Sequence, residues 1–458
     1  MIRSFRLAIA GLALLAAATA PMAATAGPLK RLLPTLPASP LATKPPKSRL
    51  TILVSIDGFR ADYLDRGDTP TLSALAADGV RSEMRPSFPS LTYPNHYALI
   101  TGKRPDRNGI VNNVMNDTTI PSALFRMSNK DAVNDGRWWS QATPLWVSLE
   151  KKGKPAAAMF WPGSQAEIKG VRPSRWVEYD HEMPPEARVD MLLSWLDDPK
   201  GPELRFSTLY FDDVDTDGHH YGPESAEVRA AAARVDKALA RLVEGLKARG
   251  RYDTTDLVIV ADHGMAPVPA SQRWMLDDIL DVSKVRVIST GAVLGLTPRR
   301  GHEKEIENIL IAPPWRLKLP HPRITLPWQD KATEVETAGF KPPPHMTCWR
   351  KGEMPRRFHY GTNARIPAIV CLSEPGWQVS TRAAKPSKWD RMDGGAHGYD
   401  PADPTMRAVF VARGPSFKSG VSLPAFDNVD VYPLLARISG VRAERGDGRL
   451  KTVKDALR

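Results

Sequence analysis

Acidic and imidazole side chains stand just after three apolar runs of this sequence, where buried strands would end, and in one glycine-rich stretch. They comprise a lone aspartate, an Asp-His pair, an aspartate and a histidine four positions apart, and a histidine in a glycine-rich stretch: Asp57, Asp262, His263, Asp215, His219 and His397. Carboxylates and imidazoles without thiolates are typical ligands of catalytic zinc or manganese. Each alone is also what an ordinary turn, helix cap or structural hydrogen bond contains. Their joint occurrence predicts a metal centre with enough ligands for two ions.

One hydroxyl stands apart from the other Ser and Thr residues of the chain. Thr92 lies in the stretch Pro89–Pro94, whose prolines predict a rigid turn rather than a regular helix or a central strand. Residues 95–102 are predicted to form a short helix that Gly102 ends. A turn that leads into a helix N-terminus presents N–H groups to an anion and places a hydroxyl where it could attack one. The alternative is a Ser/Thr cap on an ordinary surface helix.

The elements that must position these residues alternate along the chain. Apolar runs typical of buried parallel strands occur at 50–56, 156–160, 206–211, 257–261, 368–372 and 408–412. Amphipathic helices lie between several of them, most clearly at 224–249. The alternation predicts an α/β fold with a mostly parallel central sheet flanked by helices. Ligands bind beyond the carboxyl ends of such strands, so we expect the four clusters at one edge of the sheet.

The alternation is interrupted between about 286 and 365, where prolines gather and strand signals are short. We expect a smaller insertion or cap over 286–350 within a main domain of 50–445. Cys348 and Cys371 are the two cysteines of the chain. In an exported protein they are expected to form a disulfide, worth about 3 kcal/mol if unstrained, that closes this region.

The N-terminus and the overall charge limit the classes of function. Residues 1–26 carry arginines, an apolar run and a small-residue cleavage site, which predict a secretory signal and a secreted or periplasmic protein. The proline-rich stretch 27–49 is expected to be a linker, and no membrane span is expected after cleavage. The net charge of +12 is scattered, so it favours anionic substrates without indicating a nucleic-acid groove or a protein partner.

Several motifs in the same order resemble the nucleotide pyrophosphatase/phosphodiesterase family of the alkaline phosphatase superfamily, in a bacterial secreted form. The resemblance extends over about 50–440, and its motifs lie at 54–60, 91–97, 109–113, 215–223, 262–265, 357–361 and 397–400. It implies an alkaline-phosphatase-like sandwich with a mostly parallel sheet. It also implies a small-molecule nucleotide substrate, whose diester or pyrophosphate bond is hydrolysed to release a nucleoside 5′-monophosphate through a covalent phosphothreonine.

The resemblance also assigns roles by motif. It implies two Zn²⁺ ions, one held by Asp57, Thr92, Asp262 and His263 and the other by Asp215, His219 and His397. Thr92 would be the nucleophile, and Asn113 a neutral donor to a phosphoryl oxygen. Tyr93 and Tyr210 would sandwich a nucleobase. Two departures are visible, because Ser90-Leu91 stands where the family often has Thr-Lys, and Tyr93 stands where it often has phenylalanine.

Other functions remain open at this point. One is a phosphomonoesterase, phosphonate hydrolase or sulfatase of the same superfamily, although the stretch Ser87–Leu91 lacks the arginine of the sulfatase motif and Asn113 supplies no cation. A second is a lipid-headgroup diesterase acting on lysophospholipids or glycerophosphodiesters. The third, from another class, is an exported metal- or polyanion-binding protein without catalysis. The complete ligand set together with Thr92 favours an enzyme.

Overall fold

The computed structural model describes residues 49–311, 345–384 and 392–458. The expected signal segment 1–26 lies outside these residues, as do nearly all of the expected linker 27–49 and the stretch 312–344 of the expected insertion. Within the described part of the chain, no helix is both long and apolar enough to cross a membrane. The folded region begins with strand β1 (Leu50–Ile56).

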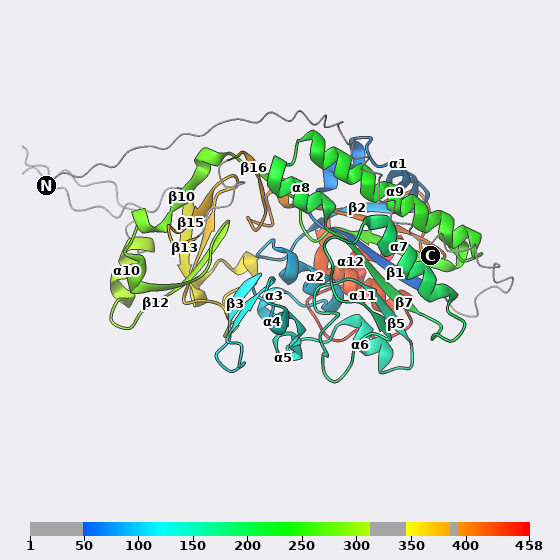
Figure 1. The fold of residues 1–458 in the computed structure, drawn as a ribbon, viewed down its shortest axis with the longest axis horizontal. Helices are drawn as coiled ribbons and strands as arrows, with labels where there is room; N and C mark the ends of the chain where they lie inside the picture. The colour runs from blue at the N-terminus through cyan, green and yellow to red at the C-terminus, as the bar shows by residue number, and fades with distance from the viewer. Residues whose placement is uncertain (1–48, 312–344, 385–391) are drawn as a thin grey trace, which may run out of the picture. The chain divides into compact units, whose positions relative to one another are not determined.

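A nine-stranded sheet forms the centre of the fold (Figure 1). Besides β1, its strands are β2 (Val80–Arg85), β5 (Ala156–Met159), β6 (Arg175–Trp176), β7 (Phe206–Phe211), β8 (Thr255–Val260), β17 (Ala408–Arg413), β18 (Val421–Ser422) and β19 (Phe426–Asp427). Their order is β18-β2-β17-β8-β1-β7-β5-β6, with β19 beside β2. The strands from β8 to β6 are parallel, whereas β17 is antiparallel to β8 and β2. The predicted α/β fold with a mostly parallel central sheet is confirmed.

The register of the three central strands brings their carboxyl ends to one edge. Every residue of β1, β7 and β8 is buried, as expected for strands covered on both faces. Ser55 in β1 lies beside Tyr210 in β7 and Val260 in β8. Asp57 and Asp262 each follow two residues later, so both leave the sheet at the same edge.

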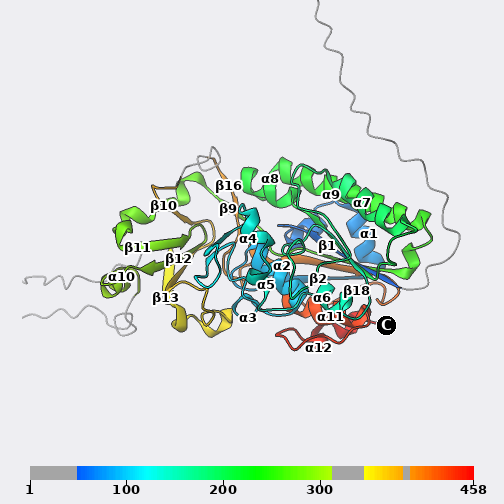
Figure 2. The ribbon, with the colours of Figure 1, turned by 60° about the horizontal axis from the view of Figure 1, so that its bottom comes forward.

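Helices cover both faces of this sheet. In the views of Figures 1 and 2, α1, α7 and α9 lie on one side and α2, α6 and α11 on the other. The long helix α9 begins after Ser225, whose hydroxyl accepts the Val228 N–H at 3.2 Å, and it confirms the helix expected at 224–249. The helix bounds are α1 (Pro70–Asp78), α2 (Thr92–Thr101), α3 (Pro105–Asn108), α4 (Lys130–Asn134), α5 (Gly136–Trp139), α6 (Leu145–Glu150), α7 (Pro185–Asp197), α8 (Asp213–Tyr221), α9 (Ala226–Ala248), α11 (Val431–Ile438) and α12 (Leu450–Val453).

A second, antiparallel sheet occupies the region where the alternation breaks. Its order is β11-β12-β14-β13, with bounds β11 (Val285–Ser289), β12 (Val293–Pro298), β13 (Met346–Arg350) and β14 (Ile369–Ser373), and α10 (Glu303–Leu310) follows β12. The prediction that 368–372 joins the central sheet is therefore wrong. An apolar run indicates that a strand is buried. It does not indicate which sheet the strand joins or in which direction the strand runs. For the same reason, the apolar run 408–412 did not indicate that β17 runs antiparallel to its neighbours.

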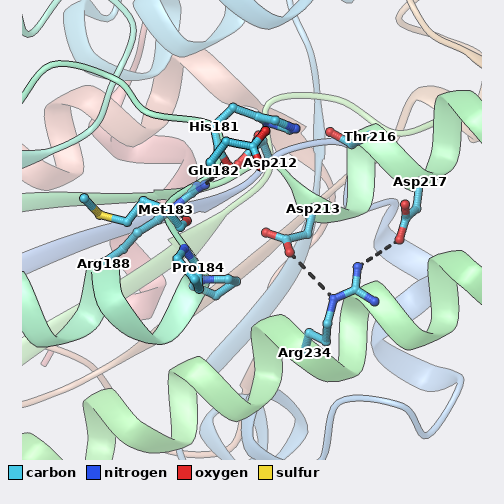
Figure 3. A pocket seen from close by; sticks show the side chains of 11 residues that line it. His181, Glu182, Met183, Pro184, Arg188, Asp212, Asp213, Thr216, Asp217 and Arg234 are labelled. Carbon is cyan, nitrogen blue, oxygen red and sulfur yellow. Dashed lines mark hydrogen bonds and ion pairs between the residues drawn. The ribbon is translucent and has the colours of Figure 1, made fainter. Parts of the chain in front are cut away.

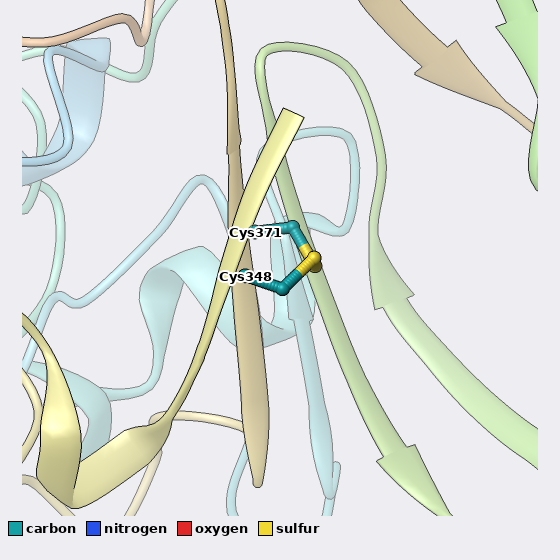
Figure 4. Close-up of a disulfide and its surroundings, with 2 residues drawn as sticks. All are labelled: Cys348 and Cys371. Atoms are coloured by element: carbon teal, nitrogen blue, oxygen red, sulfur yellow. A yellow bond between two sulfur atoms is a disulfide. The ribbon is translucent and has the colours of Figure 1, made fainter. Parts of the chain in front are cut away.

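A disulfide crosslinks this smaller sheet. Cys348 in β13 and Cys371 in β14 lie directly opposite each other, and their sulfur atoms are bonded (Figure 4). The expected pairing is present, and it indicates folding in an oxidising compartment. The sheet has a small apolar core of its own. It overlaps the insertion expected at 286–350, and the role of that insertion as a cap stays a proposal.

Short two-stranded ladders complete the fold. β9 (Ala266–Val268) pairs antiparallel with β16 (Gly394–Ala396), and His397 follows β16 directly. His397 therefore approaches from this ladder and not from the edge of the central sheet, which corrects the expectation that all four clusters share that edge. The other ladders join β3 (Val114–Asn116) to β4 (Leu124–Arg126) and β10 (Arg273–Met275) to β15 (Gln378–Ser380).

Candidate active site

The candidate nucleophile stands at the first residue of a helix. α2 begins at Thr92, and Gly102 ends it in the left-handed conformation. The prediction that the prolines keep Thr92 outside a regular helix is wrong. Pro94 is tolerated because the N–H groups of a first helical turn have no partner within the helix. Thr92 is buried, and its Oγ1 lies 3.3 Å from Nε2 of His263.

Three of the predicted ligands form a buried cluster at the ends of β1 and β8. We call Asp57, Asp262 and His263 the strand-end group, because their ligand atoms all lie within 4.8 Å of one another. Nε2 of His263 is 3.0 Å from Oδ2 of Asp262 and 3.5 Å from Oδ1 of Asp57. The Thr92 hydroxyl approaches the same nitrogen, so it faces the same point as the carboxylates.

The other three predicted ligands converge at helix α8. We call Asp215, His219 and His397 the helix group, and their ligand atoms also lie within 4.8 Å of one another. Asp215 and His219 are one turn apart on the same helical face. Nε2 of His219 lies 3.4 Å from Oδ2 of Asp215, and Nε2 of His397 lies 3.6 Å from Oδ1. The two Nε2 atoms are 3.1 Å apart.

The two groups are direct neighbours. The rings of His263 and His397 stack with centroids 3.5 Å apart and planes 13° apart. Gly58, in the left-handed conformation after β1, lies so close to α8 that an added Cβ would be 3.0 Å from Cα of Asp215. The structure thus brings together all seven residues selected as ligands from the sequence, Thr92 included. Their binding of metal stays a prediction.

Each ligand imidazole is oriented by the main chain. Nδ1–H donates to a backbone carbonyl at 2.9 Å in all three cases, from His219 to Gly395, from His263 to Gly264 and from His397 to Ser90. Donation from Nδ1 leaves the lone pair on Nε2, as is typical of metal-ligating histidines. The Nε2 lone pairs of His219 and His397 then face each other, which is repulsive unless a cation lies between them.

The carboxylates show the same need for a positive charge. Asp57 Oδ1, Asp215 Oδ1 and Asp262 Oδ2 are buried oxygens without a hydrogen-bond partner among the described residues. Burial without a partner costs free energy. Burial raises the pKa of Asp57 well above its usual range, and the carboxylates of Asp262 and Asp215 raise it further. Burial also lowers the pKa of His397 well below its usual range, so its imidazole is neutral. The residues present therefore fit divalent cations.

Further side chains hold the strand-end group in place. The Tyr210 hydroxyl donates to Oδ2 of Asp57 at 2.6 Å. His96 is wholly buried, with Nε2 2.8 Å from Oγ of Ser55 and Nδ1 2.9 Å from the carbonyl of Thr92. Its Nδ1 also lies 3.3 Å from Oδ2 of Asp262. These contacts link the helix that carries the nucleophile to the sheet that carries the carboxylates.

Asn113 lies beside the start of α2. Its Oδ1 accepts the main-chain N–H of Tyr93 at 2.9 Å. Because the carbonyl oxygen of the side chain is engaged, the orientation of the amide is fixed and its NH₂ group is left to donate elsewhere. This geometry is compatible with the predicted donation from Asn113 to a phosphoryl oxygen, which stays a prediction.

A cavity of about 330 Å³ leads away from the ligands. Asp57, Thr92 and Asp215 lie in its wall, so it adjoins both groups. Much of the remaining wall is aromatic and comprises Tyr93, Phe160, Trp161, Tyr179 and Tyr210. One end of the cavity therefore adjoins the candidate nucleophile and ligands, and the other end is lined by aromatic rings.

The aromatic residues of the cavity differ in exposure. Tyr93 is partly buried against Phe125 and Trp139. Tyr210 is only 8% exposed, and its hydroxyl is engaged by Asp57, so its predicted stacking role stays a prediction. Tyr179 is 40% exposed and offers more of its ring.

The sequence analysis missed Tyr179, Trp161 and His181, which all line the cavity. Trp161 directly follows the apolar run 156–160, the same strand-end position that identified Asp57, so the sequence did contain a signal for it. Tyr179 and His181 lie in a loop between β6 and α7 that has no periodicity. Only their contacts in the folded chain identify them.

Comparison with known proteins agrees with this fold. Human ectonucleotide pyrophosphatase/phosphodiesterase 5 superposes with a TM-score of 0.77 at 29% identity, covering 90% of this chain and all of that one. An inactive threonine-to-alanine variant of the murine protein, in complex with AMP, gives the same TM-score at 28% identity and the same coverage. Fold and site together define a hydrolase with an alkaline-phosphatase-like fold.

The family model for type I phosphodiesterase / nucleotide pyrophosphatase matches residues 51–400, and the chain belongs to this family. An uncharacterised pyrophosphatase/phosphodiesterase of Schizosaccharomyces pombe is 32% identical over 87% of this chain and 78% of its own length. Ectonucleotide pyrophosphatase/phosphodiesterase family member 3 of Bos taurus is 33% identical over 87% of this chain, which spans 43% of that protein.

Proposed function

We propose that this protein hydrolyses phosphodiester and pyrophosphate bonds of nucleotides and releases nucleoside 5′-monophosphates. The observation that carries the proposal is the position of the Thr92 hydroxyl, which faces the strand-end group in the wall of an aromatic cavity. Family membership supports the activity, and the AMP complex of the murine relative supports a nucleotide as substrate. Aromatic walls suit a nucleobase because every base has a π-face.

We propose two Zn²⁺ ions as the resident metals. Asp57, Thr92, Asp262 and His263 would hold one, and Asp215, His219 and His397 the other. Oxygen and imidazole ligands without thiolate fit zinc, and the unpartnered carboxylate oxygens support the presence of cations. When bound, such cations supply positive charge that favours ionisation of a hydroxyl and neutralises charge developing on a phosphoryl group.

The chain's own residues then perform a double displacement. Oγ1 of Thr92 gives up its proton and forms a bond to phosphorus, while the bond from phosphorus to the leaving oxygen breaks and that oxygen takes up a proton. The product of this step is a phosphothreonine diester at the start of α2. Water next attacks the same phosphorus, the bond to Oγ1 breaks, and the threonine hydroxyl is restored with the release of the nucleoside monophosphate.

Other residues bind and orient the substrate. The NH₂ group of Asn113, held by the Tyr93 main chain, donates to a non-bridging phosphoryl oxygen. Tyr93 and Tyr179 offer aromatic faces to the base, and Tyr210 closes the wall between them and Asp57.

We further propose secretion, to the periplasm in a bacterial host. The disulfide supports an oxidising compartment. The signal segment expected at 1–26 would supply the export route, and the smaller sheet would act as a cap beside the cavity.

One set of assays tests the proposed function. Turnover of p-nitrophenyl thymidine 5′-monophosphate is compared with that of p-nitrophenyl phosphate and p-nitrophenyl phosphorylcholine, with and without a chelator. We expect the nucleotide diester to be preferred by well over tenfold and all turnover to depend on metal. A preference of less than tenfold over the monoester contradicts the proposal, and faster turnover of the choline ester indicates a lipid-headgroup diesterase instead.

A further inference from the structure

The loop between β6 and α7 presents two aromatic side chains to the cavity, and one carboxylate holds both. The Tyr179 hydroxyl donates to Oδ2 of Asp212 at 2.6 Å. Nδ1 of His181 donates to the same oxygen. Figure 3 shows the His181 ring beside Asp212. Both residues line the nucleotide cavity and also a neighbouring pocket of about 260 Å³. The shared oxygen of Asp212 thus fixes both rings of this loop.

A buried arginine fixes the carboxylate in turn. Arg188 in α7 is 1% exposed, and its Nη1 donates to Oδ1 of Asp212 at 2.7 Å and to the carbonyl of Tyr210 at 3.0 Å. Its Nε donates to the carbonyl of Met183, and its Nη2 to the carbonyl of His181. One guanidinium therefore ties the loop to the end of β7. Burial raises the pKa of the Asp212 carboxyl group. The charge of Arg188 and the hydrogen bonds from Tyr179 and His181 outweigh this effect, so the pKa of Asp212 lies below its usual range.

Asp212 also connects this network to the helix that carries two of the predicted metal ligands. Asp212 is the residue before α8, the helix that carries Asp215 and His219. An aspartate at this position commonly caps the helix with its side chain. Here the side chain makes no cap hydrogen bond and is directed to Tyr179, His181 and Arg188 instead. The carboxylate is thus diverted from a helix-capping role to the aromatic end of the cavity.

We propose that Asp212, clamped by Arg188, is a positioning residue that sets the orientation of Tyr179 and His181 at the mouth of the nucleotide cavity and so determines the affinity for the base. The inference rests on the proposed nucleotide substrate. Tyr179 gains a fixed ring plane from its hydroxyl bond and from edge-to-face contact with Phe160 at 5.1 Å. A ring fixed before binding loses less conformational entropy when a base stacks on it.

This network acts on binding and not on the bond-breaking step. Asp212 contacts neither Thr92 nor a member of the strand-end or helix group through any hydrogen bond of the described residues. Its removal is therefore expected to change the KM for a substrate that carries a base, while kcat stays the same. A diester without a base is expected to be insensitive to it.

The test compares two substrates in the metal-loaded full chain. For Asp212→Asn we expect KM for p-nitrophenyl thymidine 5′-monophosphate to rise about tenfold, with kcat and zinc content within twofold of wild type. With methyl p-nitrophenyl phosphate, which has no base, kcat/KM should be unchanged. Asp217→Asn is the matched control, because Asp217 lines the neighbouring pocket, binds Arg234 at 2.9 Å and does not line the nucleotide cavity (Figure 3).

Asp212→Asn leaves the buried Arg188 without its carboxylate partner, and this variant could fail to fold. A second variant keeps the inference testable in that case. Tyr179→Phe keeps the ring and removes its hydroxyl, which bonds to Asp212 at 2.6 Å and approaches Nδ1 of His181 at 3.4 Å. The variant should raise KM for the nucleotide diester severalfold without affecting the base-free diester. Where both variants fold, their effects should be less than additive in the double variant. Equal losses on both substrates, or an unchanged KM in Tyr179→Phe, overturn the inference. Absence of nucleotide turnover in the wild type instead contradicts the proposed function.

Discussion

The two ligand groups of the active site sit on different scaffolds and differ in exposure. The strand-end group follows two neighbouring strands at the centre of the sheet, and its side chains are 2% exposed or less. The helix group combines a helix with the end of a short ladder, and the side chains of His219 and Asp215 are 38% and 17% exposed. The rigid, buried group adjoins the nucleophile, whereas the more open group lies on the other side of the stacked histidines.

This contrast separates two demands on the site. A nucleophile must be held in a fixed position near its activating charge, and a buried sheet edge with supporting contacts from His96 and Tyr210 meets that demand. The departing part of the substrate needs an exit to solvent, and the partly exposed helix group offers one. We therefore expect the strand-end group to be the more sensitive of the two to substitution and the slower to release metal.

Removal of both metal ions should abolish turnover, which is the largest effect expected, and should occur in two phases. A chelator reaches the partly exposed helix group first, so one equivalent of zinc is expected to leave quickly and the second slowly. Activity should fall roughly a hundredfold or more with the first equivalent, because charge stabilisation by a metal ion amounts to several kcal/mol. Zinc content and diester turnover measured along one dialysis series test this. Loss of both equivalents in a single phase would remove the distinction between the groups.

Replacement of the nucleophile should separate chemistry from metal binding. Thr92→Ala is expected to lower kcat by about 10⁴-fold or more, because no other described hydroxyl occupies its place beside His263. Zinc content should fall only partly, and only for the ion proposed at the strand-end group, because that ion loses Thr92 and keeps Asp57, Asp262 and His263. Single-turnover assays and metal analysis of the variant provide the measurement. Wild-type rates would exclude Thr92 as the nucleophile.

A matched pair of ligand substitutions compares the groups directly. Asp262→Asn removes a charge that is buried between His263 and His96, and it is expected to reduce kcat/KM about 10³-fold. His219→Asn changes a side chain that solvent can replace, so a loss of about 10²-fold is expected, with partial recovery at high zinc concentration. Rescue of Asp262→Asn by zinc, with no rescue of His219→Asn, would reverse the assignment of rigid and open groups.

The smallest effect should come from the contact that places His397. A Cβ on Gly394 would lie 2.4 Å from the carbonyl of His219, so Gly394→Ala must push β16 away from α8. We expect about tenfold lower kcat/KM and weaker zinc binding at the helix group alone. Gly352→Ala is the control, because no described atom lies within 4 Å of its added Cβ. If Gly394→Ala has unchanged kcat/KM and zinc binding, the ladder of β9 and β16 can shift to accommodate the added methyl group.

Much of the site could be predicted because its residues follow buried strands. Asp57 and Asp262 follow adjacent parallel strands and lie at the same edge of the sheet. This shared edge could be predicted because each aspartate directly follows an apolar run in the sequence. The helical spacing of Asp215 and His219 is likewise visible in the sequence. The assignment of the residues to two groups came from the family resemblance. All seven side chains converge in the structure, and their roles stay predictions.

The remaining features depend on contacts between distant segments. The apolar run 368–372 has the composition of a central strand, yet it pairs antiparallel with β12 and β13, and its own residues do not indicate these partners. α2 begins at Thr92, three residues before the predicted helix 95–102, because Pro94 lies in the first turn, where a missing N–H breaks no helical hydrogen bond. Tyr179 and His181 gain their places only through Asp212 and Arg188, which no local pattern links to them.

The acceptors that orient the three ligand imidazoles are carbonyl oxygens of the backbone. Every amino acid carries such an oxygen, so mutation at the acceptor positions cannot delete it and can only displace it. The carbonyl of Ser90 is kept by any residue that preserves the path of the chain, whereas the buried Ser90 hydroxyl has a separate contact, because it donates to the carbonyl of Tyr399 at 2.9 Å. Gly395 is constrained by shape instead, because an added Cβ would lie 2.5 Å from the carbonyl of Gly218. The tautomer of each histidine is thus protected by the course of the polypeptide rather than by the identity of its neighbours.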